Sequence, residues 1–132
     1  MSRTLTCRVV SPERPLFEGA VDRLVAPGAK GELGIYPLHA PLISKLGPGV
    51  VRLHEGQKVT RLAIRDGFLE VKDDAVTLLV SRAVTPADVD RATAERELAE
   101  TVEELRHPGS DERFRELLEQ RRWLEVCVRM HG

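Results

Sequence analysis

Glu32 and His39, seven positions apart in a stretch rich in glycine and proline, are a candidate acid and base pair. A carboxylate beside an imidazole can act as a general acid–base pair when the fold brings both within hydrogen-bond reach of a substrate. His39, His54, His107 and His131 lie in different segments without metal-ligand spacing, which predicts no zinc site. The glycine-rich stretch lacks the Lys-Ser/Thr of a phosphate-binding loop, and no serine has a nucleophile-elbow context. The sequence therefore predicts no catalytic residues, and a small enzyme built on Glu32 and His39 stays open as an alternative.

A second charged pair, Asp88 and Arg91, lies where a helix is expected to begin. Thr85 and Pro86 are the residue types preferred at the N-cap and at the first helical position. On one helix running to about Arg106, Asp88 and Arg91 are i,i+3 neighbours, so an ion pair on a common face is expected. The expected buried face of this helix consists of Val89, Ala92, Leu98, Ala99, Val102 and Leu105.

Arginines and two aromatic residues mark the last segment of the chain. His107 to Gly109 should end the first helix, and Ser110 to Glu112 is typical of the start of a second. Two helices of about 20 residues joined by a tight turn predict an antiparallel hairpin. Arginine and large aromatic residues concentrate at interfaces, which favours a contact surface here, although a solvated helix face remains the alternative. The residues concerned are Arg113, Arg115, Arg121, Arg122, Arg129, Phe114 and Trp123, and the expected apolar face is Phe114, Leu117, Leu118, Leu124 and Val128.

The elements before residue 86 have the pattern of strands. Leu5, Cys7 and Val9 alternate with polar residues, and similar short apolar runs follow turn signals as far as Val80. Eight of the 10 glycines lie at or before Gly67, so turn-rich sequence gives way to helix-forming sequence. These patterns predict an antiparallel β-sandwich or barrel in residues 1–85 and a helical hairpin in residues 86–132. Phe17 and Phe68 are expected in the core.

Charge and composition exclude several classes of protein. Residues 1–85 carry 12 Lys+Arg and 9 Asp+Glu, net +3, while residues 86–132 carry 8 and 12, net −4. Neither half has the excess of clustered basic residues that is typical of nucleic-acid binding. Cys7 and Cys127 have no paired spacing, which predicts two buried free thiols rather than a disulfide or metal site. The chain shows no apolar leader and no run of about 18 apolar residues, so membrane association is expected only through a partner.

The segment from Pro27 to Leu42 combines stiffness with apolar side chains. It holds three prolines and three glycines in sixteen positions, yet Leu33, Ile35 and Leu38 must still be buried or bound. Glycine permits tight backbone paths and proline fixes φ, so the segment is interpreted as a loop of fixed shape suited to docking.

The same segment carries a resemblance to a known family. The run GELGIYP from Gly31 to Pro37, followed by HAPL from His39 to Leu42, resembles the signature of the epsilon subunits of bacterial F-type ATP synthases. Similar motifs surround it, namely VVSPE with LFEG upstream, and PGVVR and GFLEV downstream. Together they cover residues 1–85 almost continuously. Leu38 departs from the pattern, because the family usually has glycine there.

The resemblance implies a fold and an assembly. A β-sandwich of about ten strands followed by a two-helix antiparallel hairpin is expected to sit on the gamma subunit in the central stalk, one copy per complex, against the polar loops of the c-ring. The complex would lie at the cytoplasmic face of the bacterial inner membrane and translocate protons. The chain itself would be non-catalytic, would need no cofactor and would help to transmit torque. Its hairpin would extend into the catalytic alpha/beta subunits to inhibit ATP hydrolysis.

The resemblance also implies roles for individual residues. Gly31, Glu32, Leu33 and His39 are expected to face the c-ring, and Ala40 and Asp66 to face gamma. Asp88, Arg91 and Ala92 resemble a motif associated with regulatory ATP, with Ala87 in place of the usual aliphatic residue. Arg115, Arg121, Arg122 and Trp123 are the expected inhibitory contact. A free-standing ligand-binding β-module with a helical dimerisation tail is the alternative function.

Overall fold

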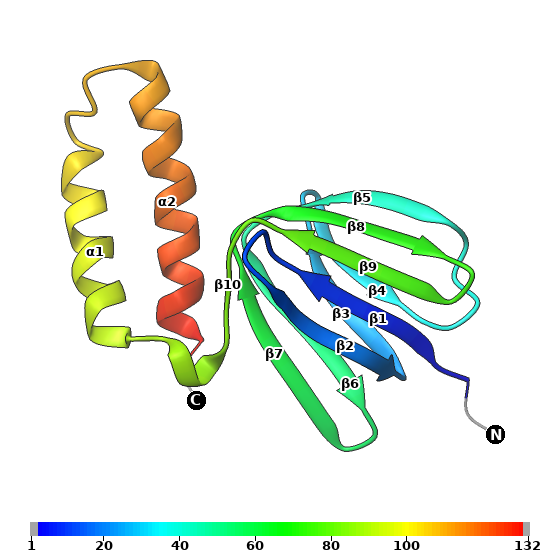
Figure 1. Ribbon diagram of the computed structural model, residues 1–132. Coiled ribbons are helices and arrows are strands. Elements are labelled where there is room, and N and C mark those ends of the chain that lie inside the picture. Colours follow the sequence, from blue (N-terminus) through cyan, green and yellow to red (C-terminus); the bar gives the residue numbers. More distant parts are fainter. Residues whose placement is uncertain (1–2, 131–132) are drawn as a thin grey trace.

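The computed structural model describes residues 3–130 and shows ten strands followed by two long helices (Figure 1). His131, one of the histidines considered above, lies outside this range. The strands are β1 (Leu5–Val10), β2 (Pro15–Val21), β3 (Arg23–Gly28), β4 (Gly31–Ile35), β5 (Leu42–Leu46), β6 (Gly49–Glu55), β7 (Lys58–Ile64), β8 (Gly67–Lys72), β9 (Ala75–Val80) and β10 (Ala83–Val84). A 3-10 turn, η1 (Pro86–Asp88), precedes α1 (Arg91–Glu104) and α2 (Asp111–Arg129). The expected order, strands and then a helical hairpin, is confirmed.

The strands form one sheet that curls on itself into a sandwich. Its order is β10-β7-β6-β3-β5-β8-β9-β1-β2, with β4 paired to β3, and β2 lies against β6. All pairs are antiparallel except β1 with β9, so the expected antiparallel sandwich is confirmed and includes one parallel pair. The inner face is a continuous apolar core that includes Leu5, Cys7 and Val9, as the alternating pattern predicted.

Phe68 does not belong to that core. Its side chain is 55% exposed, because the register pairs Phe68 with Lys45 and Leu79 on the outer face of the sheet. Leu69 and Val71 of the same strand take the inner positions. Period-2 alternation shows that a strand has two faces, but only the pairing with its neighbours decides which one is covered.

The segment from Pro27 to Leu42 is more regular than a loop. Its first part is the β3–β4 hairpin, and only residues 36–41 form a loop before β5. At Gly28 a Cβ would lie 2.5 Å from the carbonyl oxygen of Gly31, and Gly31 has φ of +133°, so the turn closes only with glycine. The glycines therefore serve a hairpin turn as well as the fixed shape that was expected.

The first long helix begins later than the sequence suggested. Thr85 and Pro86 start the short turn η1, Val89 is extended, and α1 begins after Asp90. Asp90 is the N-cap, since its carboxylate accepts from the backbone N–H of Thr93 at 3.1 Å. This hydrogen bond, together with the one that the Thr93 hydroxyl donates to the same carboxylate, holds the pKa of Asp90 below its usual range.

The helix faces also differ from expectation. On α1 the buried residues are Ala94 and Thr101, whereas Val102 is 45% exposed. A hydropathy pattern does not predict the burial of Thr101, because threonine is polar. Its hydroxyl can be buried because it donates to the carbonyl of Glu97 and accepts from the side-chain amide of Gln120 on α2. On α2 the buried residues are Leu117, Trp123, Leu124, Val126 and Cys127, while Phe114 is 42% exposed. In the described part of the chain, neither helix is long and apolar enough to span a bilayer.

Candidate functional site

The first group of expected contact residues lies at the β3–β4 turn. Gly31 and Glu32 are exposed, and Leu33 is partly buried against the core. The carboxylate of Glu32 lies 3.2 Å from the guanidinium of Arg52 on β6. An exposed pair of this kind contributes about 1 kcal/mol at most, so Glu32 is available to a partner at little cost.

His39 lies in the loop after β4, beside the residue that departs from the family pattern. The backbone of Leu38 adopts the left-handed conformation, with φ of 68°, which explains why glycine suits this position. Its backbone N–H donates to Oδ1 of Asp74 at 2.7 Å, and Arg3 lies 3.2 Å from the same carboxylate. These two contacts, with Leu38 the larger, hold the pKa of Asp74 below its usual range. The loop is therefore tied to the β8–β9 turn.

Glu32 and His39 consequently lie at opposite ends of β4. The strand extends the backbone between them, and each side chain has another partner: Arg52 for Glu32, and the carbonyl oxygen of Ala40, 2.7 Å from Nδ1, for His39. The alternative of an enzyme with an acid–base pair at these residues was wrong. The four residues expected to face the c-ring also divide between the two ends of the strand.

Ala40 and Asp66, the residues expected to face gamma, are likewise not neighbours. The antiparallel register of β5 with β8 pairs Leu42 with Val71 and Leu46 with Gly67, which places Ala40 and Asp66 at opposite ends of this pair. The outer face between them carries Ile43, Phe68 and Leu79, exposed by 74%, 55% and 55%. We call these three residues the apolar strip. Sequence reasoning missed it because each residue lies in an ordinary strand pattern.

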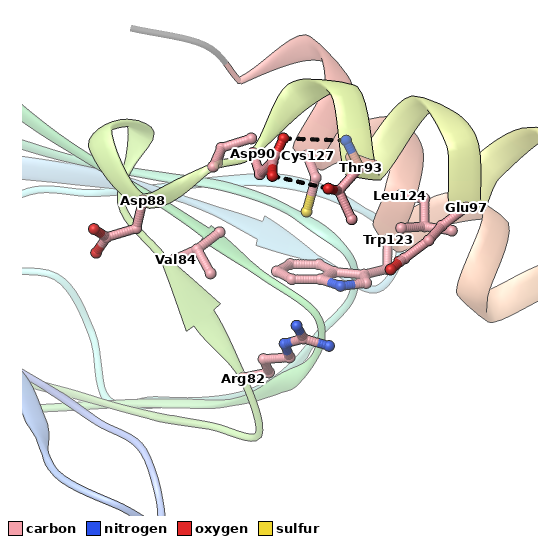
Figure 2. Close-up of a pocket in the computed structure, with 11 residues that line it drawn as sticks. Arg82, Val84, Asp88, Asp90, Thr93, Glu97, Trp123, Leu124 and Cys127 are labelled. Atoms are coloured by element: carbon pink, nitrogen blue, oxygen red, sulfur yellow. Dashed lines mark hydrogen bonds between the residues drawn. The ribbon is translucent and has the colours of Figure 1, made fainter.

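The hairpin contacts the sandwich through a second apolar cluster, separate from the sandwich core. Its centre is Trp123, which is 3% exposed, and the guanidinium of Arg82 lies 5.5 Å from the centre of the indole ring (Figure 2). We call this cluster the dock. Its buried members are Ala63, Ala94, Trp123, Leu124, Val126, Cys127 and Met130.

A cavity of about 180 Å³ lies at the root of the hairpin, beside the dock (Figure 2). Its charged lining consists of Arg82, Asp88, Asp90 and Glu97, so its formal charge is one positive against three negative, net −2. Cys127 also lines it, and burial raises the pKa of that thiol. We call this space the root cavity.

Asp88, Arg91 and Ala92 are not assembled into a common site. Asp88 accepts from the Thr85 hydroxyl at 3.0 Å, Arg91 lies 2.9 Å from Glu95, and Ala92 is exposed. The expected i,i+3 ion pair was wrong, because the extended residues at 89 and 90 separate η1 from α1. Of the three, only Asp88 lines the root cavity.

The residues expected to form the inhibitory contact have different surroundings. Arg115 and Arg122 are exposed, Arg121 lies 3.3 Å from Glu125, and Trp123 is buried in the dock. In the described conformation Trp123 therefore faces the sandwich rather than a partner. No local motif signals its contact with Arg82, since these residues lie in separate elements.

Comparison with known proteins identifies relatives across the whole chain. The family model for the beta-sandwich domain of the ATP synthase delta/epsilon chain matches residues 4–86. The ATP synthase epsilon chain of Leptospira borgpetersenii is 43% identical over 101 residues, covering 76% of this chain and 79% of that protein. The epsilon chain of Acidithiobacillus ferridurans is 38% identical over 130 residues, covering 98% of this chain and 91% of that protein.

Two solved structures share the fold at low sequence identity. A chain in the Euglena gracilis mitochondrial ATP synthase, in a structure of OSCP, F1 and c-ring, aligns with a TM-score of 0.84 at 20% identity, covering 93% of this chain and 78% of that one. A chain in the central stalk and c-ring of the Tetrahymena thermophila mitochondrial ATP synthase aligns with a TM-score of 0.67 at 15% identity, covering 98% and 94%.

Proposed function

The chain belongs to the ATP synthase epsilon family, as a non-catalytic subunit, and we propose that it sits in the central stalk of a bacterial F-type ATP synthase and links the c-ring to the catalytic head through gamma. The observation that carries this proposal is the match to an epsilon chain over 98% of the residues. The solved neighbours come from assemblies that contain a c-ring. One copy would bind per complex at the cytoplasmic face of the membrane, which it would reach only through its partners, and proton flow through the ring would drive rotation.

The apolar strip is the surface best suited to gamma. It lies between Ala40 and Asp66, and apolar side chains exposed this far on adjacent strands are typical of a face that a partner covers. The β3–β4 turn with Glu32 presents a polar surface that suits the polar loops of the c-ring. His39, expected from the resemblance to face the c-ring, lies at the other end of β4 beside Ala40, so we propose that its loop extends the gamma contact instead.

Replacing an apolar strip residue by aspartate should weaken binding to gamma by more than about tenfold, because hot-spot residues, which cluster at the centre of an interface, contribute about 2 kcal/mol or more. Ile43→Asp and Phe68→Asp are the test variants, and Val102→Asp on α1 is the matched control, since Val102 is also an exposed apolar residue. Co-purification of tagged gamma with each variant measures the effect. Equal recovery of all variants would place gamma elsewhere, and a stable homodimer of the chain alone would favour the alternative β-module.

The hairpin is proposed to switch between the docked conformation and an extended one that enters the alpha/beta head and blocks ATP hydrolysis. Its attachment to the sandwich is small: the dock is centred on one indole ring, and α1 contributes only Ala94 to its buried set. A contact of this size is compatible with two states within a few kcal/mol of each other. In the extended state Arg115, Arg121, Arg122 and Trp123 would become available to an acidic segment of a catalytic subunit.

Regulatory ATP at Asp88, Arg91 and Ala92 stays a prediction, and the described geometry does not fit it. Asp88 and Arg91 are engaged by Thr85 and Glu95, and the adjoining root cavity has a net charge of −2, which repels a polyphosphate. Instead, Asp88 closes η1 through its hydrogen bond with Thr85, and Arg91 pairs with Glu95 at the start of α1.

Isothermal titration of the full chain with ATP, repeated for Arg91→Ala, tests this point. We expect the two titrations to give the same binding heat, because Arg91 is paired with Glu95 and does not line the root cavity. Glu95→Ala is the matched control for loss of that ion pair. Binding heat that disappears only in Arg91→Ala would show that the motif holds the nucleotide after rearrangement.

A further inference from the structure

A second cavity, of about 290 Å³, lies between the hairpin and the end of the sandwich. One wall is formed by the β3–β4, β5–β6 and β7–β8 turns, and the other by Glu119 and Arg122 on α2. We call this space the bridge cavity, because it has one wall on each part of the molecule. It is separate from the root cavity, and the two share no lining residue.

Three cationic side chains converge on the bridge cavity from three elements: Lys45 from β5, Arg65 from the β7–β8 turn and Arg122 from α2. Within residues 3–130 none of them forms an ion pair within 4 Å. Asp66 and Glu119 also line the cavity, so its formal charge is three positive against two negative, net +1. The root cavity, by contrast, has a lining of net negative charge.

We propose that the bridge cavity binds a small phosphoryl anion that keeps a proton near neutral pH, such as inorganic phosphate. Arginine provides paired N–H donors that match phosphate oxygens, and lysine adds a third cationic donor. The two carboxylates suit an anion that retains a proton, because a P–OH group can donate to Asp66 or Glu119. A fully ionised sulfate has no such donor and is disfavoured by the same carboxylates.

The position of the bridge cavity couples ligand binding to the position of the hairpin. Lys45 and Arg65 belong to the sandwich and Arg122 to the hairpin, so the anion contacts both parts only while the hairpin is docked. A ligand that binds one state alone stabilises that state by RT ln(1 + [L]/Kd), where [L] is the free ligand concentration. Phosphate should therefore favour the docked hairpin, a regulation that rests on the proposed switch, whereas binding itself does not.

Titration of the full chain with inorganic phosphate, followed by amide chemical shifts and with chloride added to constant ionic strength, tests the site. We expect saturable shifts at the β7–β8 turn and on α2, and weaker binding of sulfate. Arg65→Ala and Arg122→Ala should each weaken phosphate binding by about tenfold or more, the size expected for a hydrogen bond to a charged group. Arg106→Ala, which removes an exposed arginine outside the cavity, should bind phosphate as the unchanged chain does.

Three outcomes would contradict the proposal. Shifts that follow ionic strength and do not saturate would show general screening. Equal weakening by Arg106→Ala would show a non-specific response of the surface, and equal affinity for sulfate would remove the role of Asp66 and Glu119. The measurement needs neither gamma nor the assembled complex, so it can fail while the proposed stalk function holds, and the reverse is also true.

Discussion

Removal of residues 86–132 is expected to raise ATP hydrolysis by the assembled complex about twofold or more while leaving assembly intact. The reason is that two hairpin states of similar free energy divide the complexes between them, so about half are blocked at any time. Without the hairpin the blocked state does not exist. The surface proposed for gamma, the apolar strip with the loop around His39, lies within the sandwich, and among the described residues the buried members of the sandwich core end at Val80. Assembly should therefore not depend on the removed segment.

The measurement is the ATPase rate of the purified complex carrying the truncated chain, compared at equal amounts of bound chain. A complex carrying Val102→Ser is the control for a harmless change in the hairpin, because this side chain is exposed on α1. An unchanged rate in the truncated complex would remove the inhibitory role. Loss of the chain from the complex would instead show that the boundary at residue 86 is misplaced.

Local patterns predicted the strands but not how they pair. The alternation of Leu5, Cys7 and Val9 was sufficient to place these side chains inside β1. The same alternation could not assign Phe68, because its exposure follows from pairing with Lys45 and Leu79 in distant strands. Pairing is a long-range property, and no single sequence window contains it.

The candidate sites were harder to predict for the same reason. Glu32 and His39 are near in sequence, but β4 holds them apart, whereas Trp123 and Arg82 are distant in sequence and in contact. At the start of α1 the local signal was present but ambiguous. Thr85-Pro86 and Asp90 with Thr93 both have the residue types of a helix start, and only the second caps α1.

Trp123→Ala should release the hairpin from the sandwich. Truncating a buried tryptophan commonly costs about 3–5 kcal/mol, and here the loss falls on the dock rather than on the sandwich core. Amide hydrogen exchange should accelerate throughout α2 while the strands keep their protection. Phe114→Ala is the matched control, since it removes an aromatic ring from the same helix at a position that is 42% exposed. Equal loss of protection in the strands would show that hairpin and sandwich unfold as one unit.

The two cysteines and the ATPase rate provide independent readouts of the same variant. Cys127 belongs to the dock and should react faster with a thiol reagent once the hairpin leaves, whereas Cys7, whose burial raises its pKa to about 12, should stay unreactive.

In the assembled complex Trp123→Ala should lower ATP hydrolysis, because it favours the extended state, while truncation raises it. Opposite signs from two changes in one segment are expected of a hairpin that inhibits when released. A fall in both would point to a hairpin that the complex needs for structure alone.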